Sequence, residues 1–95
     1  MKNIRLSEIK LKMWEKTMMP KSEKIDGKYV KTGEKEEQTT YTFLDNEGDK
    51  LVFLSSEQKY RHQEGKTGEL LISLAYDGFN KRNVLKFHGF LPSEN

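Results

Sequence analysis

Apolar side chains recur at every second position over residues 69–76, and this alternation restricts the fold more than any other feature of the chain. The alternating positions are Leu70, Ile72, Leu74 and Tyr76. A period of two is typical of a β-strand with one buried face. Residues 83–91 continue the pattern. One face of this strand is expected to carry Leu85, Phe87 and Leu91, and the other face Lys86, His88 and Phe90. The link 77–82 contains Asp-Gly and Asn, so the two segments are expected to form a hairpin.

A second hairpin is expected where residues 39–44 and 51–54 flank the polar turn 45–49. Both flanking segments are rich in β-branched, aromatic or leucine side chains. The hairpin needs one apolar face, so the interior is expected to take Tyr41, Phe43 and Phe53. An exposed stacking platform is the alternative role for Tyr41 and Phe53. Residues 55–68 lack apolar runs and begin with a serine, which indicates a short helical turn followed by a loop.

The N-terminal segment 1–18 fits two patterns. Alternation of Ile9, Leu11 and Met13 with polar residues predicts a strand, whereas Leu6, Ile9 and Met13 also form a helical stripe behind a Ser7 cap. We favour the strand, because alanine occurs once while threonine and aromatic residues are frequent. Residues 20–37 hold no apolar run and are expected to form a long polar loop or a loose hairpin. Residues 92–95 are expected to form a C-terminal tail.

The length of 95 residues suits about one small domain, so residues 1–95 are expected to form a single domain. Only 34% of the residues are hydrophobic, so the core must be thin. A closed or nearly closed sheet would use these apolar residues economically. Cysteine is absent, which fits a reducing compartment, and no segment has the apolar run of a signal peptide or membrane helix. A cytoplasmic location is therefore expected.

The expected order is a long strand, a polar loop, a hairpin, a short helical turn and a second hairpin. Residues 39–53 resemble the second and third strands of small single-stranded-DNA-binding proteins with the oligonucleotide/oligosaccharide-binding (OB) fold. Residues 65–74 and 84–90 resemble the fourth and fifth strands of the same proteins. The resemblance implies an all-β, five-stranded Greek-key barrel with a short helical turn between strands three and four. It also suggests an origin in a phage, plasmid or other mobile element.

In OB barrels the ligand lies on strands two and three, flanked by the loops that join strands one and two and strands four and five. In this chain both loops carry an aromatic residue among lysines or arginines. Cations track phosphates and aromatic rings stack on bases, so we expect binding of single-stranded DNA or RNA with little sequence preference. The candidate residues are Tyr29 and Lys31 in the first loop, Phe79, Lys81 and Arg82 in the second, and Lys10, Lys12 and Trp14 on one face of the first strand. Packing against the core is the alternative role for Trp14, and packing over a barrel end is the alternative for Phe79.

The formal net charge of +2 hides an uneven distribution. Ten of the 17 lysine and arginine residues fall within residues 1–35, against five acidic residues. Residues 36–58 hold one basic residue and six acidic ones. A basic patch forms only if the fold brings the first and last thirds of the chain together. The acidic residues of 34–37 and 45–49 would repel phosphate if they lay near the site.

Catalysis and metal binding find little support in the sequence. Cysteine nucleophiles are absent, and neither His62 nor His88 has metal-ligand spacing or an evident triad partner. We therefore expect no enzymatic activity, no metal and no cofactor. The alternative function is a protein-interaction module that uses an exposed strand edge or the acidic hairpin, and exposed edges would also allow a homodimer.

Overall fold

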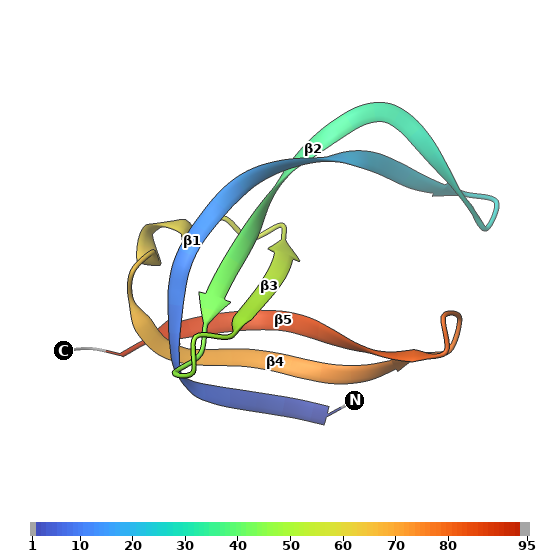
Figure 1. The fold of residues 1–95 in the computed structure, drawn as a ribbon. Coiled ribbons are helices and arrows are strands. Elements are labelled where there is room, and N and C mark those ends of the chain that lie inside the picture. The colour runs from blue at the N-terminus through green and yellow to red at the C-terminus, as the bar shows by residue number, and fades with distance from the viewer. Residues whose placement is uncertain (1, 94–95) are drawn as a thin grey trace.

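The computed structural model describes residues 2–93, which form one antiparallel sheet of five strands. The strands are β1 (Lys2–Ile25), β2 (Lys28–Leu44), β3 (Lys50–Ser55), β4 (Thr67–Asp77) and β5 (Arg82–Pro92). Figure 1 shows the sheet, whose strand order is β3-β2-β1-β4-β5. The prediction of a mainly β fold is confirmed. The expected helical turn between β3 and β4 is a 3-10 turn of three residues, η1 (Arg61–Gln63).

β1 is the central strand and belongs to both halves of the sheet. Residues 2–10 pair with β4, and residues 10–25 pair with β2. The strand interpretation of the N-terminal segment is therefore correct. The sheet curls so that its two edge strands, β3 and β5, approach each other (Figure 1). They meet through side chains, with the ring centroids of Phe53 and Phe87 5.9 Å apart.

A β-bulge in β1 sets which of its side chains face the interior. Leu11 pairs with Phe43, whereas Met13 pairs with Thr42, so Lys12 is an extra residue in the ladder. One extra residue shifts the alternation by one position. Trp14 consequently lies opposite the buried Tyr41 on the interior face. The expectation that Lys10, Lys12 and Trp14 share one face is therefore wrong.

A second bulge has the same effect in β5. Leu71 pairs with Gly89 and Ile72 pairs with Phe87, which makes His88 the extra residue. After this bulge, Phe90 is buried and Leu91 is exposed, which reverses the faces expected from the sequence. The alternation therefore predicts the faces of β5 correctly up to Phe87 and wrongly beyond it.

The core lies on the interior face of the curled sheet and is rich in aromatic rings. Its buried residues are Ile9, Leu11, Tyr41, Phe43, Tyr60, Leu70, Ile72 and Phe90. Tyr41 and Phe43 are buried as predicted, and Phe53 packs against them from a partly buried position. Phe43 and Phe90 lie 5.3 Å apart between ring centroids. Because each ring fills a large volume, few apolar residues suffice to form this core.

Residues 20–37, expected as a long polar loop or a loose hairpin, are a paired hairpin arm that extends β1 and β2 beyond the core. Its turn consists of Asp26 and Gly27, whose φ angles are 51° and 78°. Positive φ at both positions gives the tight turn that matches the twist of paired strands. Every residue from 20 to 36 is exposed. We call this segment the β1–β2 arm.

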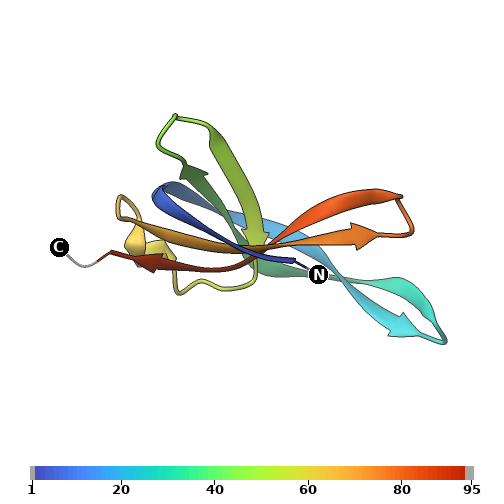
Figure 2. The same cartoon turned by 90° about the horizontal axis from the view of Figure 1, so that it is seen from below.

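Strands β4 and β5 also extend beyond the core and end in the turn 77–82, which we call the β4–β5 tip. Figures 1 and 2 show that this tip and the tip of the β1–β2 arm lie at the same end of the molecule. The molecule measures 50 × 28 × 20 Å, which reflects these two extensions. The fold therefore brings two distant parts of the sequence to one end.

The C-terminal part of the described chain consists of β5 and Ser93. Pro92 still belongs to β5, and the backbone N–H of Ser93 donates to the Thr67 carbonyl oxygen at 2.8 Å. The expected tail 92–95 therefore begins later than predicted, and its residues 94–95 lie outside the described residues. Between residues 2 and 93 no helix is long and apolar enough to cross a membrane.

Candidate nucleic-acid interface

The tip of the β1–β2 arm, residues 24–31, has two different faces because its strands are paired in a fixed register. Lys24 lies opposite Tyr29, and directly opposed residues share a face of the ladder. Lys31 follows Tyr29 by two positions and lies on the same face. Tyr29 is 77% exposed, so this face presents an accessible ring between two lysines. Ile25 and Val30 belong to the opposite face.

The basic character of the arm is confined to this tip. Over residues 20–37, five lysines are matched by five acidic residues, so the arm as a whole is not basic. The tip itself holds three lysines, Lys24, Lys28 and Lys31, against Asp26. Lysines therefore gather at the tip of the arm, and acidic residues outnumber lysines in the rest of the arm, which we call its stem.

The β4–β5 tip is organised by the carboxylate of Asp77. Its Oδ1 accepts hydrogen bonds from the backbone N–H groups of Phe79 at 3.0 Å and Asn80 at 3.3 Å, and its Oδ2 accepts one from Asn80 Nδ2 at 2.7 Å. These bonds, led by those from Asn80, hold the pKa of Asp77 below its ordinary value. The turn fixes Phe79 at the apex, where it is 92% exposed. Phe79 therefore does not pack over a barrel end.

Two cations follow Phe79 in the same tip. Lys81 adopts a left-handed conformation with φ 54° and completes the turn, and Arg82 begins β5 opposite Asp77. Both residues are exposed. The tip thus repeats the combination seen at the β1–β2 arm, an exposed ring beside cationic side chains.

Tyr76 adds a third exposed ring, which the sequence pattern assigned to the buried row of β4. It is 67% exposed, although Leu70 and Ile72 on the same face of the strand are buried. The reason is that β4 and β5 continue past the core before they reach the tip. Alternation identifies the face of a strand but does not show where the core ends.

The structure places one group of sequence candidates at one end of the molecule and another group in the body of the sheet. Tyr29, Lys31, Phe79, Lys81 and Arg82 lie on the two tips at one end of the molecule (Figure 2). Lys10 and Lys12 lie in the body of the sheet, where Lys10 pairs with both Leu44 and Thr67. These two lysines are exposed but do not belong to either tip.

Trp14 has a packing role. Its side chain is partly buried against the core, and the guanidinium carbon of Arg61 lies 4.6 Å from its ring centroid. A cation stacked on the ring occupies the surface that a base would need. Of the two roles considered for Trp14, packing is the one that the structure supports.

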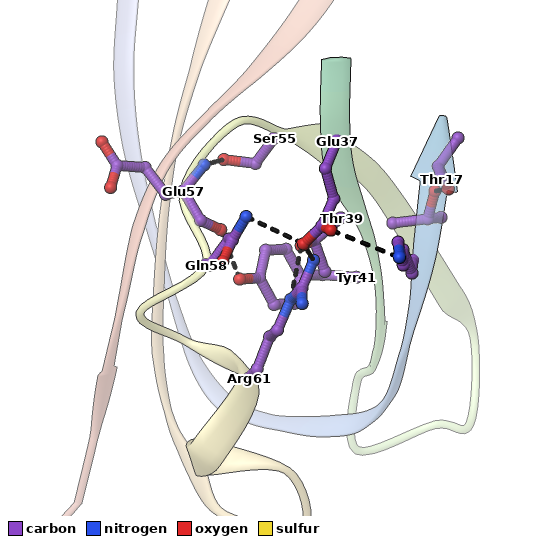
Figure 3. Close-up of polar contacts among 10 residues, drawn as sticks. Thr17, Glu37, Thr39, Tyr41, Ser55, Glu57, Gln58 and Arg61 are labelled. Atoms are coloured by element: carbon purple, nitrogen blue, oxygen red, sulfur yellow. Dashed lines mark hydrogen bonds and ion pairs between the residues drawn. The ribbon is translucent and has the colours of Figure 1, made fainter. Parts of the chain in front are cut away.

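Arg61 belongs to a polar network that joins the stem of the β1–β2 arm to the segment before β4 (Figure 3). Arg61 Nη2 donates to Glu37 Oε2 at 2.9 Å, and Arg61 Nε donates to Thr39 Oγ1 at 2.7 Å. Gln58 Nε2 donates to the same Glu37 oxygen at 2.9 Å, and Lys16 Nζ lies 3.5 Å from Glu37 Oε1. The network fixes the linker between β3 and η1 against β2.

Tyr41 strengthens this connection from inside the core. Its hydroxyl donates to the backbone carbonyl of Glu57 at 2.5 Å. Burial, the largest cause, raises the pKa of the Tyr41 hydroxyl above its ordinary value of 10.0. Tyr41 is fully buried and therefore provides no stacking surface.

Several of the acidic residues that could repel phosphate have partners of their own. Glu37 contacts Arg61 and Lys16, and Glu34 lies 4.0 Å from Lys21 Nζ. The carboxylate of Asp45 accepts hydrogen bonds within its own turn. The turn between β2 and β3 lies away from the two tips in both views (Figures 1 and 2). Glu37, Glu34 and Asp45 are thus paired or held within their own turn, while Asp26 remains an acidic side chain at the tip of the β1–β2 arm.

Sequence reasoning missed the pairing of Arg61 with Glu37. The two residues are 24 positions apart, and neither sits in a periodic apolar segment that would mark its place. Only the fold of the linker onto β2 brings them into contact.

No protein-family description matches the chain, and neither a curated protein nor a solved structure is similar enough to count as a match. Among residues 2–93 no group of three or more histidine, cysteine or acidic side chains could hold a metal ion.

Proposed function

We propose that this protein is an OB-like barrel that binds single-stranded nucleic acid with low sequence specificity through its two hairpin tips. The topology supports the proposal: a long first strand pairs with both β2 and β4, and a short helical turn separates β3 from β4. The side-chain contact between Phe53 of β3 and Phe87 of β5 also supports the proposal, because the two edges of an OB barrel lie near each other.

The observation that carries the proposal is the pair of exposed rings at one end of the molecule. Tyr29 and Phe79 are the most exposed large hydrophobic side chains of the described residues. Each comes from a different hairpin, and each has cationic neighbours on its own tip. Two accessible rings beside cations at one end of the molecule are the combination that single-stranded nucleic acid uses.

Unpaired bases suit these rings, since each base stacked on an aromatic side chain contributes roughly 1–3 kcal/mol. Every base presents a stacking face, which is why the expected sequence preference is small. Five cations lie on the tips: Lys24, Lys28, Lys31, Lys81 and Arg82. Lys28 lies opposite Ile25, on the face away from Tyr29. If the other four contact phosphates, the logarithm of the binding constant falls with the logarithm of salt concentration with a slope of about −2.8.

Fluorescence anisotropy with a labelled oligothymidine tests this function. We expect saturable binding at low salt, weaker binding to a duplex of equal length, and a salt slope close to the value above. Replacement of either ring, in Tyr29→Ala or Phe79→Ala, is expected to weaken binding by about tenfold, which corresponds to roughly 1.4 kcal/mol. Leu91→Ala is the matched control, because Leu91 is an exposed apolar residue at the C-terminal end of β5. Absence of binding at low salt would exclude the function.

Charge is tested in the same way. Lys31→Ala is expected to weaken binding and to reduce the salt slope by about 0.7, the contribution of one phosphate contact. Lys66→Ala is its control, because Lys66 is an exposed lysine in the segment between η1 and β4. Equal effects of the two substitutions would contradict an interface at the tips.

A second candidate function, strand pairing with another protein chain, is supported by the exposed edge of the sheet. β3 is an edge strand, and its side chains Val52 and Leu54 are exposed on the outer face of the sheet. An apolar edge strand can pair with a strand of another chain, including a second copy of this one. Sedimentation velocity tests it: if β3 pairs with itself, the wild type sediments as a dimer and Leu54→Lys as a monomer. A monomeric wild type at high concentration argues against self-pairing.

A further inference from the structure

Two adjoining depressions lie on β1, β4 and β5, apart from the tips. The first has a volume of about 530 Å³ and is lined by Asn3, Ile4, Arg5, Leu71, Ile72 and His88. The second has a volume of about 360 Å³ and lies where the segment around η1 meets β5. Both are lined by Leu71 and His88, so they form one continuous surface. We call it the His88 groove.

The charged side chains that line the groove are cations, and its uncharged polar side chains can both donate and accept hydrogen bonds. Arg5 and Asn3 line the first depression, and Lys59, His62 and Gln63 line the second. Neither lining includes an aspartate or glutamate, although the chain has 15 acidic residues. At its edge, Glu69 Oε2 lies 3.3 Å from Arg5 Nε, so a phosphate would share the Arg5 guanidinium with this carboxylate. Such a lining suits an anion.

His88 occupies its central position because of the bulge in β5. As the extra residue in the ladder, it lies beside β4, where its Nε2 is 2.6 Å from Ser73 Oγ. Ser73 is fully buried, so its hydroxyl is a fixed anchor for the imidazole ring. This contact leaves Nδ1 as the second hydrogen-bonding atom of the ring. A bulge that directs a side chain into a depression is a recurrent feature of functional sites.

Apolar side chains complete the groove. They favour a ligand that has an apolar or planar part as well as an anionic group. Ile4 and Leu71 line the first depression beside Arg5, and Phe90 and Pro92 line the second. Ligand sites of about 300–1,000 Å³ commonly combine an apolar lining with a few polar groups. A planar ring or sugar would lie on the apolar side chains while its phosphate met the cations.

We propose that the His88 groove binds a small phosphorylated molecule of nucleotide size, with Arg5 and His88 as donors to its phosphate. The groove is distinct from the tips, because neither lining includes a residue of 24–31 or 77–82, and η1 and the C-terminal end of β5, which bound the second depression, lie at the other end of the molecule (Figure 1). It therefore does not depend on the proposed binding of single-stranded nucleic acid.

Isothermal titration of the full chain with ADP, inorganic pyrophosphate and adenosine tests the site. We expect saturable binding of ADP, weaker binding of pyrophosphate, and weaker binding still of adenosine, which lacks the phosphates. His88→Ala and Arg5→Gln are each expected to weaken ADP binding about tenfold, the effect of one charge-assisted hydrogen bond. Arg5 is exposed and its substitution should leave the fold intact, while Lys66→Ala serves as a control outside the groove.

Three results would contradict the proposal that the His88 groove binds a phosphorylated molecule. The first is absence of saturable ADP binding at millimolar concentration, and the second is an equal affinity in wild type and Arg5→Gln. The third is displacement of ADP by oligothymidine together with weaker oligothymidine binding in His88→Ala, because it would make the groove part of the path of the strand. Phe79→Ala is expected to leave ADP binding unchanged, which separates this site from the one at the tips.

Discussion

Loss of the Arg61 side chain is predicted to destabilise the protein more than loss of any surface ion pair. Arg61 connects η1 to β2 through Glu37 and Thr39, and it covers the ring of Trp14. Its side chain is 18% exposed and that of Glu37 is 32% exposed, so solvent screens their attraction only in part. Arg61→Ala removes all three contacts at once.

The magnitude follows from those contacts. A hydrogen bond to a charged group contributes about 1.5–3 kcal/mol, which we take at its lower end because Glu37 keeps Gln58 and Lys16 as partners. The buried Thr39 hydroxyl loses a donor, at a cost of about 1 kcal/mol. The stacked cation adds about 0.5–1 kcal/mol. We therefore expect a loss of roughly 3 kcal/mol, which lowers Tm by about 12 °C or more in a domain of this size.

Urea and thermal denaturation followed by circular dichroism measure this loss. Lys21→Ala is the matched control, because the Lys21–Glu34 pair is 4.0 Å long with side chains 49% and 73% exposed. Such a pair is expected to contribute less than about 0.5 kcal/mol. Arg61→Lys should lie between the two, since lysine keeps the charge but loses the planar fork. If Arg61→Ala and Lys21→Ala have the same stability, the network is not a structural link.

Three further predictions concern stability. Gly68→Ala is expected to prevent stable folding, because a Cβ at Gly68 would collide with the Leu91 carbonyl oxygen, whereas Gly78→Ala has room and should unfold like the wild type. Because the pKa of Asp77 is lowered in the folded protein, ionised Asp77 adds to the free energy of unfolding. This contribution is complete above the pKa of an unfolded aspartate, about 4, and is lost as pH falls through the folded pKa. An NMR titration that places the folded pKa of Asp77 above 3.8 would contradict the hydrogen bonding of the tip. Because the pKa of Tyr41 is raised in the folded protein, its contribution to the free energy of unfolding is complete below pH 10 and declines as pH rises further. An absorbance titration should show one tyrosine that ionises at higher pH than the others, and this late step should be absent in Tyr41→Phe.

The hairpins could be predicted from the sequence because their signals are local. Alternation marked β4, and the turns around Asp45 and Asp77 carry residues whose side chains hydrogen-bond to the backbone of the turn, as observed at both places. Clustering of lysines with Tyr29 and Phe79 was also visible, and both rings are exposed. These features depend on a few neighbouring residues.

The bulges could not be predicted in the same way. Lys12 and His88 are extra residues only relative to the partner strand, and nothing in the adjacent sequence distinguishes them from paired positions. Each bulge reverses the faces that follow it, which moved Trp14 to the interior and Phe90 into the core. The exposure of Tyr29 and Phe79 was therefore predicted correctly and the faces of β1 wrongly, while the binding role of the tips stays a prediction.

The most direct test of nucleic-acid binding at the tips is an NMR titration of the ¹⁵N-labelled protein with oligothymidine. If one strand contacts both tips, the backbone amides of residues 24–31 and 77–82 shift together at the same oligonucleotide concentration. The amides around Lys66, outside both tips, should stay in place. Shifts confined to one tip, or shifts that occur only elsewhere on the sheet, would contradict a shared interface.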